Sequence, residues 1–337
     1  MTTQHLSPLT MLLSRHTKRR EVMTLLGGAA AWPLTAHAQS YPSRPITLVI
    51  GFPAGGPLDV VSRLIAQALT GRLGQQVVVE NRPGATGTMA AGQVARTEPD
   101  GYTLMAIPAT FAASAALFRK LPFRPVDDFT TISMTTDFPY VLVTYSDHSI
   151  RTMADLIRAA RSQKGPLTYG TSGVGSLQHL AVEHFANLAN IKLQHVPYRG
   201  GAPAITELLG KRIDLVLDQP TALVDFIRDG RFRALAVTGG RRFFSLPDTP
   251  TISEAGFLGF DVSGWQGLVA PANLPVSVLN RLHAELTGVL GEPGIVEKLK
   301  AFGNEPNPTS PGEFKTRLAA EIERWSKVIA TANVERI

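Results

Sequence analysis

Short apolar runs alternate with amphipathic stretches through most of the chain. Residues 46–52, ITLVIGF, are almost entirely apolar, which is typical of a buried β-strand. Residues 57–73 repeat their apolar positions every three or four residues, which predicts a helix that begins at Pro57 and buries one face. Further strand-like runs are QQVVVEN, GYTLMAIP, PYVLVTY, PLTYG, KLQHVPY, IDLVLDQ and FRALAVT, with helical stretches such as TMADLIRAARS, LQHLAVEHFANLAN and APAITELLGKR between several of them. This rhythm predicts an α/β fold with mostly parallel sheets.

The last third of the chain is dominated by helical patterns. Its helical segments are PVSVLNRLHAELTGVLG, EPGIVEKLKAFG and SPGEFKTRLAAEIERWSKVIATA. In the final segment Ser310 and Glu313 have the spacing of a capping box, and Pro311 suits the first helical turn. Behind this cap, we expect a buried stripe formed by Phe314, Leu318, Ile322, Trp325 and Ile329.

Residues 1–38 have the three-part layout of a secretory signal peptide. A basic segment that ends in Arg19-Arg20 precedes the apolar run VMTLLGGAAAWPL, and Ala36-His37-Ala38 matches the A-x-A cleavage pattern. The apolar run is too short to cross a bilayer. The arginine pair also fits a twin-arginine signal, so the general and the twin-arginine export routes both stay open. A basic tail on a cytoplasmic protein is the alternative. We expect export to the periplasm, cleavage near Ala38, and a mature chain that begins near Gln39.

Composition narrows the classes of function. Hydrophobic residues make up 44% and charged residues 18% of the 337 positions, an ordinary balance for a soluble globular protein. The chain has no cysteine, which excludes disulfides and thiolate metal sites. Its net charge is +6, and removal of the leader, with four basic residues and one acid, lowers it to +3. The charge therefore gives little support to nucleic-acid binding, and we expect no nucleic-acid partner.

Two glycine-rich loops stand in the same context, with a strand before and a helix after. The first is FPAGGPLD at residues 52–59, and the second is GTSGVGS at residues 170–176. Helix N-termini present free N–H groups and the positive end of the helix dipole, so both loops suit an anion. Ligands of open α/β sheets bind at the carboxyl ends of strands, where these loops lie. If two domains face each other, the two loops would suit a small carboxylate, or a dicarboxylate held at both ends.

Other motifs fail on spacing. Neither loop has the lysine of a P-loop, and glycines at 170, 173 and 175 do not fit the dinucleotide pattern G-x-G-x-x-G. Val174 stands where an esterase G-x-S-x-G elbow needs its last glycine. His179 and His184 are five positions apart, so they do not share the helix face that an H-x-x-E-H zinc site requires. We expect no metal and no cofactor, whereas His179, in the first helical turn, is a candidate ligand contact.

Nine segments between about Tyr41 and Ala332 carry a family resemblance. They are FPAGGPLDVVSRL, VVVENRPGATGTMAAGQVA, PDGYTLM, LPFRPVDDF, YGTSGVGSLQHLAVEHF, HVPYRGGAPAITELLG, FRALAVTGGRR, LPDTPTISEAGF and SGWQGLVAP. Through them the chain resembles the TctC/Bug family, the extracytoplasmic solute receptors of tripartite tricarboxylate transporters. The resemblance implies a two-lobed, periplasmic-binding-protein-like fold of the Venus-flytrap type (type II). Its first lobe would be discontinuous, with residues 39–142 and 240–337, and its second lobe would comprise residues 143–239, so the chain would cross near 140–146 and 236–242.

The resemblance also implies a set of ligand-binding residues, because the family grips a carboxylate through backbone groups and ordered waters of the two loops. Arg199 has a surface position as its alternative role, and the alternative for Asp59 is capping its own helix. The regions around Thr110 and LDQPTAL depart from the family pattern, so the identity of the ligand does not carry over. The expected contacts are Phe52, Ala54, Gly55, Gly56, Asp59, Thr110, Thr171, Ser172, Gly173, Gly175, Ser176, Tyr198, Arg199, Gly200 and Asp218.

The function implied by the resemblance is capture of a small carboxylate, or a related small solute, for delivery to a membrane transporter. The protein would be a monomer, its partners would be the small-molecule ligand and the transporter subunits, and it would have no catalytic residues. Two alternatives stay open. One is an exported serine hydrolase with Ser172 as nucleophile and His179 or His195 as base. The other is a ligand-sensing co-receptor of a signalling system.

Overall fold

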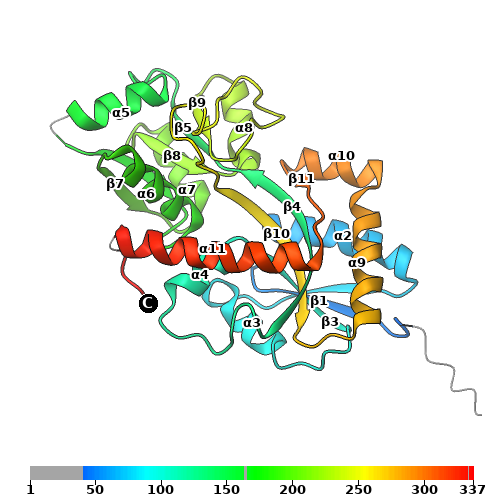
Figure 1. Cartoon of the computed structure of the whole chain (residues 1–337). Helices are drawn as coiled ribbons and strands as arrows, with labels where there is room; N and C mark the ends of the chain where they lie inside the picture. The colour runs from blue at the N-terminus through cyan, green and yellow to red at the C-terminus, as the bar shows by residue number, and fades with distance from the viewer. Residues whose placement is uncertain (1–40, 163–164, 333) are drawn as a thin grey trace, which may run out of the picture. The chain divides into compact units, whose positions relative to one another are not determined.

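The computed structural model describes residues 41–162, 165–332 and 334–337. The expected signal peptide, with its cleavage point near Ala38, lies outside these residues. Among the described residues, no helix is both long and apolar enough to cross a membrane. Residues 42–337 form one unit that contains two β-sheets, each covered by helices (Figure 1).

The first sheet has six strands in the order β11-β4-β10-β3-β1-β2. Its β1 is parallel to β2 and β3, whereas β10 is antiparallel to β3 and β4, and β11 is antiparallel to β4. The strands are β1 (Ile46–Ile50), β2 (Val77–Asn81), β3 (Thr103–Pro108), β4 (Phe129–Pro139), β10 (Ser263–Pro271) and β11 (Glu305–Pro306).

The second sheet has five strands in the order β7-β6-β8-β5-β9. Its β6 is parallel to β7 and β8, and β5 is antiparallel to β8 and β9. The prediction of mostly parallel sheets is therefore wrong, since both sheets are mixed. The cause is the path of the chain, which runs out of the first sheet along β4 and returns along β10, so these long neighbours point in opposite directions. The strands are β5 (Val141–Tyr145), β6 (Leu167–Thr171), β7 (Leu193–Pro197), β8 (Leu215–Asp218) and β9 (Phe232–Val237).

The two passages between the sheets are hydrogen-bonded to each other. Only Tyr140 separates β4 from β5, and Thr238 directly follows β9. The Tyr140 N–H donates to Thr238 Oγ1 at 2.9 Å, and the Thr238 N–H donates to the Tyr140 carbonyl at 2.9 Å. The fold is thus two-lobed, with one sheet in each lobe. We propose that the lobe boundaries expected from the sequence, residues 39–142 with 240–337 and residues 143–239, lie at these two passages.

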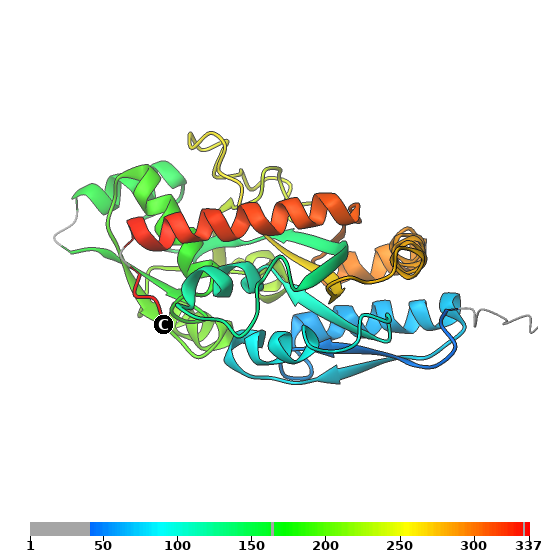
Figure 2. The ribbon, with the colours of Figure 1, turned by 60° about the horizontal axis from the view of Figure 1, so that its bottom comes forward.

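The helices begin where the sequence indicates in two instructive cases. Helix α2 has Pro57 at its first position, and α11 opens with a complete capping box between Ser310 and Glu313. Helix α11 packs against α4 and β4 of the first lobe and also against α6 of the second. Figure 2 shows this helix, in red, along its whole length. The helices are α2 (Pro57–Leu73), the short 3-10 helix η3 (Ala85–Gly87), α3 (Thr88–Val94), α4 (Thr110–Leu117), α5 (Met153–Ser162), α6 (Leu177–Ala189), α7 (Gly201–Leu209), α8 (Pro220–Arg228), α9 (Val276–Leu290), α10 (Pro293–Ala301) and α11 (Pro311–Thr331).

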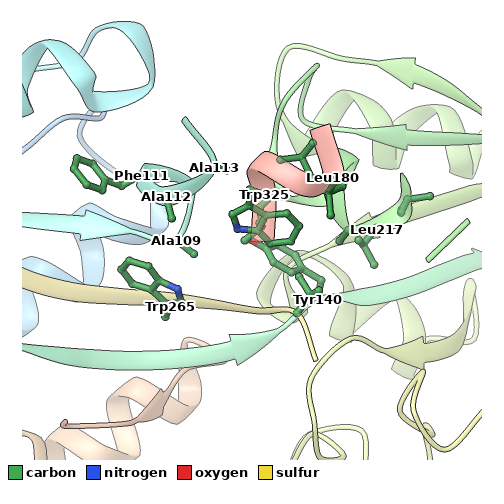
Figure 3. Close-up of a cluster of buried hydrophobic side chains, with 14 of the residues drawn as sticks. Ala109, Phe111, Ala112, Ala113, Tyr140, Leu180, Leu217, Trp265 and Trp325 are labelled. Carbon is green, nitrogen blue, oxygen red and sulfur yellow. The ribbon is translucent and has the colours of Figure 1, made fainter. Parts of the chain in front are cut away.

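A single cluster of buried apolar side chains extends through both lobes. It joins Phe111 and Trp265 of the first lobe to Leu180 and Leu217 of the second. Trp325 of α11 belongs to the same cluster, and Figure 3 shows its indole near Leu180 and Leu217. A separate, smaller cluster fills the other face of the second sheet, with Val141, Val143, Leu208, Val216 and Phe232 among its members. The shared cluster ties the lobes together on the side of α11.

Candidate functional site

One large cavity, of about 990 Å³, is lined by residues of both lobes. Both glycine-rich loops open onto it, together with the first turns of the helices that follow them. The remaining wall comes from other segments of both lobes. Its residues are Ala85, Thr86, Pro108, Ala109, Thr110, Ser114, Leu117, Phe118, Phe138, Tyr140, Gly200, Gly201, Ala202, Asp218, Gln219, Thr221, Ala222, Gly264, Trp265, Gln266 and Ile337.

The first loop is held in shape by the carboxylate of Asp59. Its Oδ2 accepts hydrogen bonds from the Gly55 N–H at 2.9 Å and from Arg63 Nε at 2.9 Å, and its Oδ1 accepts one from Asn81 Nδ2 at 2.9 Å. The hydrogen bond from Arg63 is the main reason that the pKa of this carboxyl falls to about 2. Asp59 is only 3% exposed, so its negative charge serves the hydrogen bonds that hold the loop.

The start of α2 keeps its donors available. Its N-cap, Gly56, has no side chain that could bond the first turn, and Pro57 has no N–H. Gly55 has a φ of +82°, a conformation in which glycine is favoured. The N–H groups of the first turn therefore border the cavity with no capping side chain, which is the arrangement that suits an anion.

Two histidines hold the second glycine-rich loop in place through hydrogen bonds. The Gly175 N–H donates to His179 Nδ1 at 3.1 Å, and Thr171 Oγ1 lies 2.6 Å from His195 Nε2. Ser176 caps α6 by accepting a hydrogen bond from the His179 N–H at 3.2 Å. Burial, the main cause in each case, lowers the pKa of His179 to about 4 and that of His195 to about 3, so both rings are neutral near pH 7.

Polar side chains of the second lobe form a chain along the cavity wall. Ser172 Oγ donates to Gln178 Oε1 at 3.1 Å, and Gln178 Nε2 donates to Asp218 Oδ1 at 3.4 Å. The Gln219 N–H donates to the same Asp218 oxygen at 2.8 Å. Burial raises the pKa of the Asp218 carboxyl, which is 6% exposed.

The first lobe contributes polar atoms that lack a partner. Among the described residues, the hydroxyl of Thr110 and the amide oxygen of Gln266 are buried without a hydrogen bond. Both residues line the cavity, and Gln266 is 4% exposed. An unpaired buried polar atom at a cavity wall costs free energy that a ligand group or a water can recover. A hydrogen bond to either atom, from a ligand group or a water, would recover this free energy.

Most of the expected contact residues line the cavity, although three do not. Thr171 directs its hydroxyl to His195, Tyr198 packs on the apolar cluster of the second lobe, and Arg199 is exposed. Ligand contact by these three, as by the others, stays a prediction. The residues that line the cavity are Phe52, Ala54, Gly55, Gly56, Asp59, Thr110, Ser172, Gly173, Gly175, Ser176, Gly200 and Asp218.

Sequence reasoning missed several wall residues. Gln178 lies in the first turn of α6, so its place just after the second loop was an available signal. Gln266, Trp265 and Tyr140 carry no such signal, because they come from β10 and from the passage between sheets, far along the chain from either loop.

The serine and histidines of the hydrolase alternative make hydrogen bonds within the second lobe. Ser172 Oγ bonds the Gln178 amide, while the ring nitrogens of His179 and His195 that make bonds are directed at Gly175 and Thr171. His184 stacks on Phe260. Within the part of the chain that the structure describes, no group of three or more metal-ligating side chains is assembled.

Comparison with known proteins agrees with this architecture. The model of the tripartite tricarboxylate transporter family receptor matches residues 61–334. A UPF0065 protein of Agrobacterium vitis is 37% identical over 308 residues, which cover 90% of this chain and 89% of that protein. The solved structure of the periplasmic binding protein BugD has a TM-score of 0.73 and 34% identity, and covers 88% of this chain and 99% of its own. An R. palustris protein solved with adipate has a TM-score of 0.77 and 34% identity, with 88% and 100% covered.

Proposed function

The chain belongs to the tripartite tricarboxylate transporter receptor family, and on that premise we propose that it captures a small carboxylate in its interlobe cavity and delivers it to a membrane transporter. The family is one of solute-binding receptors, so the proposal assigns no catalytic residue. It places the protein in the periplasm as a monomer, after cleavage near Ala38. N-terminal sequencing of the exported protein checks the cleavage point.

The observation that carries the proposal is the convergence of two helix starts on one cavity. The first turns of α2 and α6 both border it, each behind a glycine-rich loop. Helix starts bind anions through N–H donors and the helix dipole, without a lysine or arginine. The similar R. palustris protein was solved with adipate, which is a carboxylate. Closure of the lobes on such a ligand would create a shape that a transporter can recognise.

Native mass spectrometry of residues 39–337, exported and purified without refolding, tests the proposal. A small carboxylate released in near one-to-one ratio is the expected result. A thermal-shift screen of carboxylates and neutral solutes on the stripped protein follows. Stabilisation by neutral solutes alone, with none from any carboxylate, would reject the carboxylate proposal.

A matched pair of variants locates the binding. Gly55 and Gly74 lie at opposite ends of α2, both have positive φ, and an added Cβ would meet nothing within 4 Å at either position. Gly55→Ala and Gly74→Ala should therefore lose comparable stability, about 1 kcal/mol each, from backbone strain. Only Gly55→Ala should also weaken carboxylate binding, because only Gly55 borders the cavity. Equal binding by both variants would place the ligand elsewhere.

A further inference from the structure

We propose that the turn of residues 84–87, between β2 and α3, is a third ligand-holding element of the cavity, in which the Thr86 hydroxyl bonds an oxygen atom of the bound solute. This inference rests on the function proposed above and adds a specificity-determining residue to the same cavity. Ala85 and Thr86 are the two residues of the turn that line the wall. The reasons are the backbone conformation of the turn, its packing and its hydrogen bonds.

The turn has a strained backbone. All four of its residues have positive φ, with +153° at Gly84, +44° at Ala85, +53° at Thr86 and +89° at Gly87. Glycine adopts such values readily, whereas a β-branched residue such as threonine rarely does, because its side chain crowds the backbone. Strained residues of this kind persist where the surrounding structure holds them, and they gather at ligand sites.

Strain and cavity coincide only in this turn. Among the described residues, three other non-glycine residues have positive φ, namely Asn190, Lys211 and Asn273. None of these three lines the cavity, and Asn190 is simply the C-cap of α6. A turn that only had to redirect the chain could use glycine or asparagine in place of Thr86. The threonine side chain is therefore the feature that needs a reason.

The turn is packed directly against the start of the first glycine-rich loop. A Cβ added to Gly51 would lie 2.5 Å from Gly87 Cα, so the two backbones are in close contact. A Cβ added to Gly87 would lie 3.2 Å from Cε2 of the Phe52 ring. This packing fixes the turn relative to the first loop, while Ala85 and Thr86 stay exposed.

The hydrogen bonds of the turn leave groups that can serve a ligand. Thr86 Oγ1 donates to the Ala85 carbonyl at 2.7 Å and lies 3.0 Å from Ser114 Oγ, which also lines the cavity. A hydroxyl has one donor and two acceptor positions, so this pair can turn a proton toward a ligand oxygen or accept one from a ligand hydroxyl. The N–H groups of Ala85 and Thr86 make no hydrogen bond within the described part of the chain, which adds two uncharged donors.

Titration calorimetry on the stripped protein, residues 39–337, tests the contact. The probe is adipate or, if adipate gives no thermal shift, the carboxylate that gives the largest one. Thr86→Gly removes the hydroxyl together with the strain, so the variant should melt at or above the temperature of the unaltered protein. It should nevertheless bind about tenfold more weakly, the size expected for one lost hydrogen bond. Thr86→Ser keeps the hydroxyl and should retain most of the affinity.

Asn190→Gly is the matched control, since it relieves a similar conformation in an exposed residue outside the cavity. Its affinity for the probe should be unchanged. Unchanged affinity in Thr86→Gly, or equally weak binding by Thr86→Ser, would overturn this inference while leaving the carboxylate function intact. A lower melting temperature in Thr86→Gly would also overturn it, because the hydroxyl would then serve the fold. The absence of a thermal shift with every carboxylate would reject the proposed function itself.

Discussion

His179 and His195 stack beneath the second glycine loop, with ring centroids 3.9 Å apart and planes inclined by 13°. Each ring holds one part of the loop, since His179 bonds the Gly175 N–H and His195 bonds the Thr171 hydroxyl. Tyr169 continues the stack on His195, with centroids 5.0 Å apart. Two stacked imidazoles resist protonation, because each charge would lose water and repel the other. The loop therefore depends on a neutral histidine pair.

We expect the stability of the protein to fall as the pH drops below 6.5. The folded pKa of His179 is about 4 and that of His195 about 3, both below the ordinary value of 6.5, so the unfolded chain takes up protons first. Stability is full above pH 6.5 and decreases as the pH falls toward these folded values. The His179 contribution alone is on the order of 3 kcal/mol at pH 4. Urea unfolding from pH 7.5 to pH 4 measures it.

His179→Phe separates this effect from general acid unfolding. Phenylalanine can keep the stack but cannot accept the Gly175 hydrogen bond, so the variant should bind carboxylate more weakly and lose less stability on acidification. Asp59 cannot mimic the result, because its folded pKa is about 2 and its contribution is lost only as the pH falls below about 3.8. An unchanged pH profile in the variant would contradict the assignment.

Asp59→Asn should loosen the first loop. The change removes the charge that accepts hydrogen bonds from Gly55 and Arg63, and hydrogen bonds to charged groups contribute about 1.5–3 kcal/mol. We expect a loss of about 2 kcal/mol in the free energy of unfolding and weaker ligand binding. Asp155→Asn is the control, since Asp155 also accepts hydrogen bonds from an arginine and from the backbone, here from two N–H groups at the start of α5 in the second lobe. Binding lost equally in both variants would argue against a local effect.

Gly175→Ala should weaken binding at least tenfold. Gly175 has a φ of +73°, and the new Cβ would lie 2.2 Å from Leu117 Cδ2, so the loop or the Leu117 side chain, both at the cavity wall, would have to shift. Titration of ligand into the variant measures the loss. Adding Leu117→Ala removes the clash and should restore part of the affinity, with the backbone strain remaining. No recovery in the double variant would mean that strain alone accounts for the effect.

Trp265→Phe should destabilise the protein more than Trp325→Phe. Both indoles are almost fully buried, but Trp265 Nε1 donates to Glu321 Oε2 at 2.8 Å, whereas Trp325 Nε1 has no partner among the described residues. Without the Trp265 donor, the buried Glu321 carboxylate keeps only the hydrogen bond from Arg317 Nε. The expected cost in the free energy of unfolding is about 1–3 kcal/mol. Chemical denaturation of the two variants measures the difference. Equal costs would mean that packing, rather than this hydrogen bond, determines the result.

The sequence pattern predicted the helix starts better than the central strands. Proline and capping residues act within one turn, so Pro57 and Ser310 could be read locally. The long strands β4 and β10 were missed. In β4, threonine and serine side chains are buried alongside the apolar ones, which hides the alternation expected of a strand. Strand β10 contains glycines and a proline, which weaken the signal.

The residues of the candidate site also divide into those that the sequence predicts and those that it does not. The two loops could be found from glycines placed between strand and helix, and both border the cavity. Gln266 and Tyr140 could not be found in this way, because their position in the cavity wall depends on the packing of strands that lie far apart in the sequence. Thr171 was expected at the ligand, but the hydroxyl of this last residue of β6 is taken by His195, a pairing between neighbouring strands that spacing within one loop does not reveal.

The bonded pair Tyr140 and Thr238 makes the second lobe an inserted module. The chain on either side of this lobe meets within a hydrogen bond, so we expect that the segment between the pair, residues 141–237, can be exchanged with that of a relative without moving the ends of the host. Such an exchange would replace half of the cavity wall, including Ser172 and Asp218, while the first loop stays. The transferred segment would have to pack against Trp325 of α11 in the buried cluster that both lobes share. New ligand preferences could thus arise by recombination of whole lobes as well as by point substitution.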